Sequence, residues 1–167
     1  MSTTDDVVAL QRLQQRYADV VTRRAWPELA ELFRPDTVVE VDTVTRPLVQ
    51  TTGPEAFGRF VAGAIERFDF FAFTILSSVV DLGGPDDDPD EARGRFFMRE
   101  VRHETAIDEW NDAFGVYVDR YVRVDGRWWI AARRYRSMGR TGTDGTVHPS
   151  PLGLGPLGGD APWPDAW

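Results

Sequence analysis

Apolar positions recur at helical spacing in three segments of the first half of the chain. The predicted helices cover residues 5–24, 26–33 and 55–68. In the first of them the apolar stripe consists of Leu10, Leu13, Tyr17 and Val20. Because these positions are three or four residues apart, they lie on one face of an α-helix. Tyr17 is therefore expected inside the protein, where its hydroxyl needs a hydrogen-bonding partner or a ligand.

Five other segments alternate between apolar and polar positions or are almost continuously apolar, which is typical of β-strands. They are residues 37–45, 70–82, 95–103, 115–124 and 127–136. Helices that precede a run of strands indicate an α+β fold rather than alternating βαβ units. We expect a strongly curved, mainly antiparallel sheet that wraps the helices as a cone, with room at its mouth for a small apolar ligand.

The last two predicted strands are joined by Asp125-Gly126, which is the strongest short-range signal of a β-hairpin. Both central residues of a type I′ turn need positive φ, which these two residue types tolerate. In the first strand of this hairpin, alternation places Tyr117, Asp119 and Tyr121 on one face. An acid between two tyrosines is either a solvated charge at the sheet edge or a carboxylate in a pocket.

Composition limits the chemistry that is available. The chain has 167 residues, a net charge of −8 and no cysteine, and all 19 of its basic residues are arginine. Disulfides, thiolate nucleophiles and lysine Schiff bases are thereby excluded. With two histidines, His103 and His148, a multi-histidine metal site is excluded too, so we expect no metal. The negative charge argues against nucleic acid as a partner.

No apolar run reaches the roughly 18 residues of a membrane span, and no signal peptide is recognisable, so a cytoplasmic protein without membrane contact is expected. Composition divides the chain into one domain, residues 1–136, and a Gly/Pro-rich tail, residues 137–167. The tail is not expected to form a regular element. Trp163 and Trp167 would anchor it on the body or on a neighbouring subunit, or it is disordered.

Three stretches together carry a family resemblance: QRYADVVTRRAWPELAELFRPDTVVEVD, GPEAFGRFV and GVYVDRYVRVDGRWWIAARR. They resemble the SnoaL-like branch of the NTF2-like superfamily, over roughly Asp5 to Arg136. The resemblance implies the cone-shaped NTF2-like fold, with three N-terminal helices packed on the sheet. It leaves the reaction open, because the superfamily includes ketosteroid isomerases, polyketide cyclases, scytalone dehydratase, limonene epoxide hydrolase and non-catalytic modules that bind ligands or dimerise.

The resemblance also implies roles for individual residues. Tyr17 matches the tyrosine with which ketosteroid isomerases stabilise an oxyanion, and Asp119 matches the acid/base aspartate of SnoaL-like cyclases. The general base of the isomerases falls on Val41, which cannot accept a proton. Where dehydratases supply histidines on the middle strands, this chain has phenylalanines such as Phe73. Neither the isomerase nor the dehydratase mechanism is therefore expected in its usual form.

Asp119, Tyr17 and His103 are the candidate catalytic residues. In an apolar cavity, burial would raise the pKa of Asp119 and suit it to proton transfer; alternatively, Asp119 pairs with an arginine such as Arg99, Arg102 or Arg134. Whether the face of strand 95–103 that carries His103 lines the cavity depends on register, which the sequence leaves open. The candidate substrate-binding residues are Tyr117, Tyr121, Trp110, Phe73, Val41 and Arg134.

The resulting expectation is a cofactor-independent enzyme that moves a proton on a hydrophobic, carbonyl-bearing metabolite, as a cyclase, isomerase or dehydratase. The alternative is a non-catalytic module that binds a small ligand or dimerises. A homodimer is expected in either case, since the paired Trp and Arg residues of the last strand suit a surface between subunits.

Overall fold

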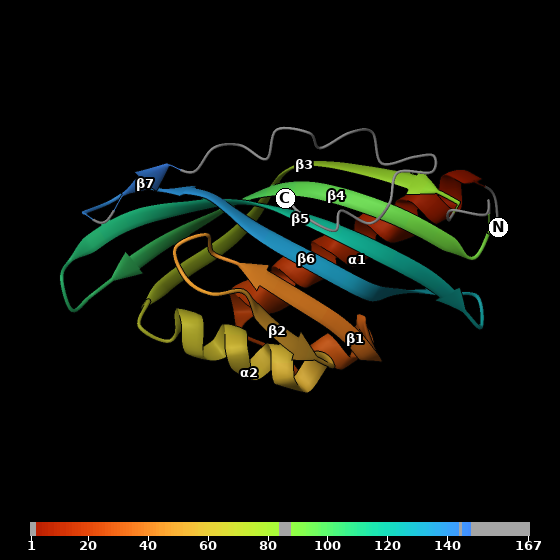
Figure 1. Cartoon of the computed structure of the whole chain (residues 1–167), viewed down its shortest axis with the longest axis horizontal. Helices are drawn as coiled ribbons and strands as arrows, with labels where there is room; N and C mark the ends of the chain where they lie inside the picture. The colour runs from red at the N-terminus through yellow and green to blue at the C-terminus, as the bar shows by residue number, and fades with distance from the viewer. Residues whose placement is uncertain (1–2, 84–87, 144, 148–167) are drawn as a thin grey trace.

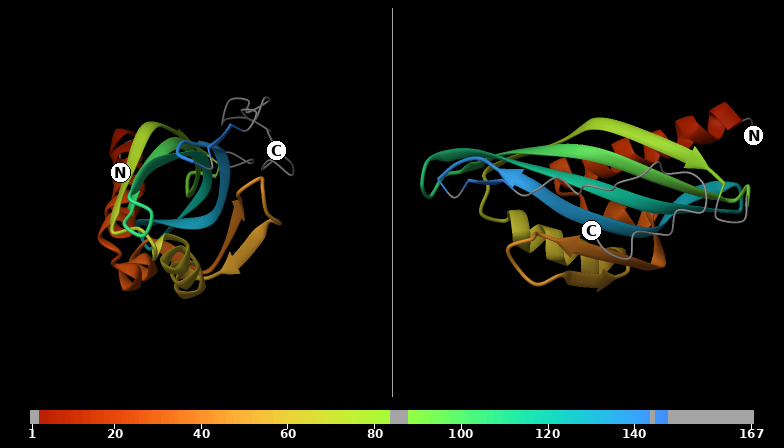
Figure 2. Two further views of the ribbon diagram at one scale, coloured as in Figure 1. Left: turned by 90° about the vertical axis from the view of Figure 1, so that its left-hand side faces the viewer. Right: turned by 45° about the horizontal axis from the view of Figure 1, so that its top comes forward.

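The computed structural model describes residues 3–83, 88–143 and 145–147. Helix α1 (Thr3–Arg23), the 3-10 helix η1 (Trp26–Glu31) and helix α2 (Pro54–Ile65) lie on one side of a curved, open sheet (Figure 1, Figure 2). The α+β class with an N-terminal helix against a curved sheet is confirmed. The segment expected as a second α-helix is instead a 3-10 helix of six residues, so the described chain has two α-helices rather than three.

The main sheet follows the spatial order β2 (Val49–Thr52), β1 (Phe33–Asp42), β6 (Arg127–Arg140), β5 (Glu109–Val124), β4 (Glu91–Glu104) and β3 (Phe70–Leu82). A two-residue strand, β7 (Thr146–Val147), pairs with β6. Every pairing is antiparallel except that of β1 with β6, which is parallel. The sheet is therefore mixed, and its four long strands form a continuous antiparallel meander.

The β5–β6 turn has the predicted geometry. Asp125 and Gly126 have φ angles of 52° and 74°, so both central residues lie in the left-handed region that a type I′ turn requires. The turn brings β5 and β6 together as a pair, and the candidate site is built from side chains of these two strands.

Strand β1 begins earlier than expected. The predicted helix over residues 26–33 and the predicted strand over 37–45 left Arg34-Pro35-Asp36 between them, yet these residues lie inside β1, which starts at Phe33. Pairing with β6 shifts between Phe33 and Val38, so the proline falls where the ladder is irregular and its missing N–H breaks no regular pairing. Strand β2 was not predicted because its four residues at the sheet edge carry little pattern.

The C-terminal tail starts later than expected. Residues 137–140 continue β6 and pair with β5 around Phe114, and β7 then adds to the same edge. These residues are covered on both sides by neighbouring backbone, which supplies the hydrogen bonds that a Gly- and Ser-containing segment needs to form a strand. Trp163 and Trp167 lie outside the described residues. No described helix has the length and apolarity needed to cross a membrane.

The core lies between α1 and the sheet. Tyr17, predicted on the buried stripe of the first helix, is 1% exposed, and Trp128 at the start of β6 is 4% exposed. The indole Nε1 of Trp128 donates to Asp6 Oδ1 at 2.8 Å and so fixes the first turn of α1 against the hairpin. At the other end of the helix, the backbone N–H of Phe73 donates to Thr22 Oγ1 at 3.0 Å.

Candidate functional site

Asp119 of β5 and Arg133 of β6 form an ion pair in which neither side chain is exposed. Arg133 Nε donates to Asp119 Oδ1 at 2.7 Å, and Nη2 donates to Oδ2 at 2.7 Å, so the two groups meet as parallel forks. Burial opposes the charge of Arg133, but the adjacent carboxylate outweighs burial and raises the pKa of the guanidinium. The expected arginine partners were Arg99, Arg102 or Arg134; the actual partner is Arg133.

A β-bulge puts Arg133 opposite Asp119. Pairing between β5 and β6 runs without interruption from the turn to Tyr121 and then shifts by one residue between Tyr121 and Arg120. Without that shift, Asp119 would lie opposite Ala132, and the carboxylate would be buried without a cation. The bulge is therefore the local feature that makes the burial of Asp119 tolerable.

A chain of hydrogen bonds continues from Asp119 through the core. The Tyr121 hydroxyl donates to Asp119 Oδ2 at 2.8 Å and accepts from Gln14 Nε2 at 2.9 Å, and Gln14 Oε1 accepts from the Ser78 hydroxyl. Gly94 on β4 leaves room for this contact, since a Cβ there would lie 2.7 Å from the Tyr121 ring and 2.9 Å from Gln14 Nε2. Three strands and α1 are thus connected through one polar chain.

Four aromatic rings surround the Arg133 guanidinium. Its central carbon lies 4.0 Å from the centroid of Tyr17, 4.9 Å from Tyr117, 5.2 Å from Phe33 and 5.4 Å from Phe96. Ring faces attract a cation, and this attraction is strongest where water is excluded. The rings and the carboxylate together hold Arg133 in one position.

The hydroxyls of Tyr17 and Tyr117 lie 3.4 Å apart inside this aromatic cluster. Burial raises the pKa of Tyr17, although the charge of Arg133 partly opposes the rise, and burial raises the pKa of Tyr117 as well. Both phenols therefore remain protonated near neutral pH. Because only one of the two hydrogens is used between them, the other can be donated to a further acceptor.

A second unused donor in this cluster belongs to Arg133. Within the described structure, Nη1 is buried and has no hydrogen-bonding partner. Buried donors without partners are rare in native proteins, because leaving a buried donor without a hydrogen bond costs about 1–3 kcal/mol of folding free energy. The unpaired Nη1 of Arg133 and the spare hydrogen of the Tyr17–Tyr117 pair are two donors in the core that are available to an acceptor oxygen.

One further acid faces this cluster. Glu100 lies on the same side of β4 as Phe96, and its side chain is 12% exposed. Both Nε (3.0 Å) and Nη2 of Arg102 donate to it. After burial itself, the negative charge of Glu100 contributes to the raised pKa of Tyr17, Tyr117 and Tyr135. Glu100 was not among the predicted site residues, because the register of β4 was open from sequence.

Two predicted binding residues lie in the core beside the cluster. Phe73 contacts Tyr17 and Tyr117 with ring centroids 5.6 and 5.9 Å away, and Val41 is 8% exposed. Aromatic rings from α1, β3 and β5 thus line the space between α1 and the sheet beside the polar groups.

His103 is not brought together with Tyr17 and Asp119. It lies on the opposite face of β4, where Nδ1 is 2.7 Å from Asp69 Oδ1 and Nε2 is 3.3 Å from Asp108 Oδ1. Hydrogen bonding to Asp69 is the main cause of the raised pKa of His103. Trp110 packs on the imidazole at 4.8 Å and is 59% exposed, so this pair forms a separate surface cluster.

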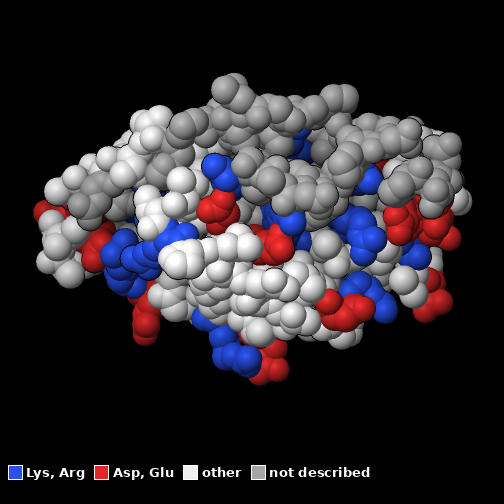
Figure 3. All heavy atoms as spheres, viewed as in Figure 1, with Lys and Arg blue, Asp and Glu red and all other residues white. Residues whose placement is uncertain are grey.

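Arg134 is also separated from the core cluster. Its side chain points to the outer face of the sheet, where it binds Glu40 on β1, and Arg136 binds Asp42 there at 2.8 Å. Figure 3 shows basic and acidic side chains interspersed on the face that it presents. Such pairing neutralises charge locally and leaves Arg134 out of reach of a ligand in the core.

Two surface cavities lie away from the cluster. One of about 430 Å³ lies between η1 and α2 and is lined by apolar residues such as Trp26 and Pro54. The other, of about 340 Å³, lies between α1 and the β5–β6 turn. Neither of these two cavities is lined by Asp119, Tyr17 or Tyr117.

The arrangement favours binding and polarising an oxygen over proton transfer by Asp119. Oδ1 of Asp119 accepts one hydrogen bond and Oδ2 accepts two, all from Arg133 and Tyr121. These contacts engage both carboxylate oxygens of Asp119 within the protein. Asp119 therefore serves to hold Arg133, and the phenols and the guanidinium are the groups with hydrogen-bonding capacity to spare.

Comparison with known proteins agrees with this fold. A candidate scytalone dehydratase from Novosphingobium aromaticivorans is 23% identical, with a TM-score of 0.71 over 92% of this chain and 97% of that one. A hexachlorocyclohexane dehydrochlorinase, LinA-type3 from Novosphingobium barchaimii, is 19% identical, with a TM-score of 0.72 over 89% and 97%. A function-unknown protein from Mycobacterium tuberculosis is 22% identical, with a TM-score of 0.65 over 82% and 76%.

At these identities the likeness concerns the fold, which hosts more than one activity. No curated protein sequence matches the chain. The family of SnoaL-like domains, in contrast, matches residues 2–134, which is most of the chain. The protein is therefore a member of the SnoaL-like family.

Proposed function

We propose that this protein binds a small, largely apolar molecule inside the fold, and that the molecule carries a carbonyl or similar oxygen that accepts hydrogen bonds from Arg133 and from the Tyr17–Tyr117 pair. The observation that supports this most directly is the buried, unpartnered Nη1 of Arg133 beside a phenol pair with a hydrogen to spare. The aromatic rings around these donors would contact the apolar body of the ligand.

The two phenols suit a neutral carbonyl because both keep the proton that they would donate. Burial raises the pKa of both tyrosines, so neither phenol loses its proton near neutral pH. Donors that are held in place before the ligand arrives bind it at little entropic cost. Asp119 contributes by fixing the orientation of Arg133 rather than by touching the ligand.

Binding can be tested with a ketone probe, 2-tetralone, followed by saturation-transfer NMR. Tyr117→Phe removes one hydroxyl and keeps the ring, and we expect it to weaken binding about fivefold, as the loss of one net hydrogen bond implies. Arg134→Gln is the matched control on the outer face and should bind like the wild type. Equal binding by wild type and Tyr117→Phe, or no binding by the wild type, would contradict the proposal.

A second candidate function is catalysis of proton transfer at the carbon next to the bound carbonyl. It is supported by Glu100, an acid on the inner side of β4 whose two hydrogen bonds from Arg102 both go to Oε2, and by structural neighbours described as a dehydratase and a dehydrochlorinase. Arg133 and the phenols would stabilise the enolate oxygen, and Glu100 would accept the proton. An isomerase, cyclase or dehydratase reaction would share this step.

The two candidates are separated by deuterium exchange. An enzyme would speed the exchange of the α-protons of 2-tetralone in D₂O, and Glu100→Gln would abolish the acceleration while leaving binding intact. A wild-type protein that binds 2-tetralone without accelerating exchange is a binding module. Asp119→Asn is not a suitable test of catalysis, since it removes one half of a buried ion pair.

We further propose that the protein forms a homodimer, with the outer face of the sheet between subunits. Trp129 and Arg134 on β6 are both partly buried on that side. Arginine and tryptophan are enriched at protein interfaces. Sedimentation at micromolar concentration tests this; a monomer across the accessible concentration range would exclude it.

A further inference from the structure

We propose that the groove between the first half of α1 and the β5–β6 turn is a second binding site, for a small organic anion with a flat apolar body. The groove has a volume of about 340 Å³, which is within the range of small-molecule sites. It lies apart from the polar cluster of the core, so this inference does not depend on the function proposed above.

The floor of the groove is apolar and rigid. It is formed by Ala9, Leu13, Gly126 and Trp128. Leu13 is 6% exposed and Trp128 is 4% exposed, so both present an edge to the groove while their bulk is packed in the core. The hydrogen bond from Trp128 to Asp6 fixes the indole, so an apolar ligand would meet a preformed edge.

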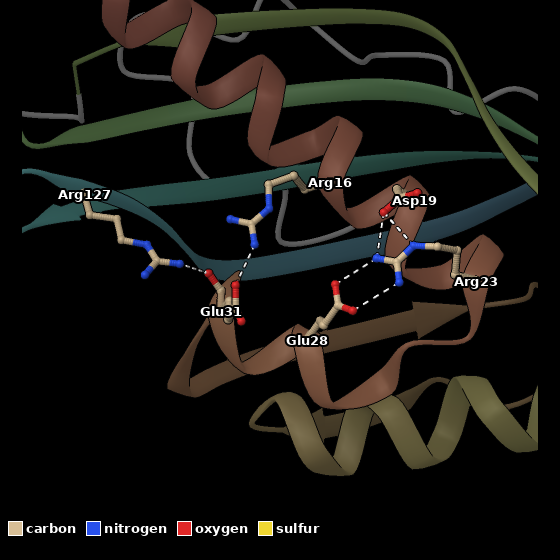
Figure 4. Close-up of polar contacts among 6 residues, drawn as sticks. All are labelled: Arg16, Asp19, Arg23, Glu28, Glu31 and Arg127. Atoms are coloured by element: carbon tan, nitrogen blue, oxygen red, sulfur yellow. Dashed lines mark hydrogen bonds and ion pairs between the residues drawn. The ribbon is translucent and has the colours of Figure 1, made fainter.

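Three arginines line the rim: Arg12, Arg16 and Arg127. Two of them are already held in place by Glu31, which Figure 4 shows between them: Arg16 Nη2 binds its carboxylate at 2.7 Å, and Arg127 Nη2 donates to its backbone carbonyl. Each guanidinium carries five N–H donors, so both retain donors for a ligand. Their fixed positions reduce the entropy lost on binding.

Arg12 supplies the charge that is not yet neutralised. Arg12 and Arg16 are four residues apart on α1, so they project from the same face of the helix. Over the described part of the chain, Arg12 forms no salt bridge, whereas Arg16 shares its charge with Glu31. In a protein whose net charge is −8, a groove with an excess of cations selects for a carboxylate or sulfonate.

The experiment uses 2-naphthoate as the probe and naphthalene-2-carboxamide as its neutral counterpart, with binding followed by calorimetry and by the Nε–H resonances of arginine. We expect the wild type to bind naphthoate and not the carboxamide, and to bind more weakly at high salt. Arg12→Gln and Arg127→Gln should each weaken binding about fivefold, as the loss of one exposed charge contact implies.

Two controls locate the site. Arg59→Gln removes an exposed arginine at the other surface cavity, and Tyr117→Phe alters the core cluster; both should bind naphthoate like the wild type. Naphthoate binding that survives Arg12→Gln and Arg127→Gln unchanged would overturn the proposal. Loss of naphthoate binding in Tyr117→Phe would also overturn it, because the anion would then occupy the core, and equal binding of the carboxamide would show that the arginines do not contribute.

Discussion

Asp119 and Arg133 are direct cross-strand partners, and each compensates the buried charge of the other. Removing one partner would leave an uncompensated charge in the core. We therefore expect Asp119→Asn to lower the free energy of unfolding by about 3–5 kcal/mol, the range for breaking a buried pair. Urea denaturation followed by circular dichroism measures the loss.

The paired replacement of Asp119→Leu with Arg133→Met provides the control. Substituting apolar side chains for both members of a buried ion pair is often neutral or stabilising, since no charge remains to be buried. The double variant should be more stable than Asp119→Asn alone. If instead the double variant is the less stable of the two, the pair does more than neutralise its own charges.

Tyr121→Phe tests the hydrogen-bond chain that runs from Asp119 to Ser78. The change removes the acceptor of Gln14 Nε2 and one donor to Asp119, while the buried ring remains. We expect a loss of about 1–3 kcal/mol, because a buried polar group is left without its partner. Gln14→Leu in the Tyr121→Phe background should recover part of the loss in thermal unfolding, and a further decrease would contradict this account.

Gly115→Ala should destabilise the protein. An added Cβ would lie 2.2 Å from the Tyr135 ring, whose burial on β6 leaves it little freedom to move. Overpacking of this kind costs about 1–3 kcal/mol. Gly63→Ala is the matched control: no atom lies within 4 Å of its added Cβ, and in the interior of α2 alanine should stabilise by up to about 1 kcal/mol. Thermal denaturation of the two variants should shift in opposite directions.

His103 should make stability depend on pH. Its pKa is raised above the ordinary value of 6.5, chiefly by the hydrogen bond to Asp69. The imidazolium therefore stabilises the fold fully below about pH 6.5, and the contribution is lost as the pH rises through the raised pKa. The pKa of Asp69 is lowered by Thr105 and His103, so its own contribution is lost only in stronger acid.

His103→Gln tests this directly. The difference in stability between wild type and variant should be larger near pH 5.5 than near pH 8.5, and urea unfolding at the two values measures it. Asp108→Asn should reduce the difference only in part, because Asp108 is the more distant carboxylate, at 3.3 Å. A difference that is independent of pH would show that the histidine contributes through packing on Trp110 alone.

The sequence predicts the architecture well because the signals of its long elements are local. The stripe of α1, the limits of β3 and the turn at Asp125-Gly126 depend on residues near one another along the chain. Alternation also predicts that Tyr117, Asp119 and Tyr121 share one face of the sheet, although it does not say whether that face is the inner one. The 3-10 form of η1 and the short edge strand β2 have no comparable local pattern.

The partners within the site were harder to predict, because they depend on register. Counting from the turn pairs Asp119 with Ala132, and only a bulge that leaves no mark in the sequence moves Arg133 into place. Register likewise determines which face of β4 points inward, and therefore that Glu100 rather than His103 lies on the side of the cluster. Residue type identified the acid, and three-dimensional pairing determined what the acid can do.

The parallel contact of β1 with β6 has a consequence for how the chain folds. The first strand made on the ribosome can complete its ladder only with the last long strand, so most of the chain must emerge before this edge of the sheet closes. Until then, the apolar side of the segment that contains β1, β2 and α2 is expected to remain exposed. Exposed apolar surface of this kind is what chaperones bind on nascent chains. Folding of this protein is thus expected to be a late, concerted event rather than a stepwise one.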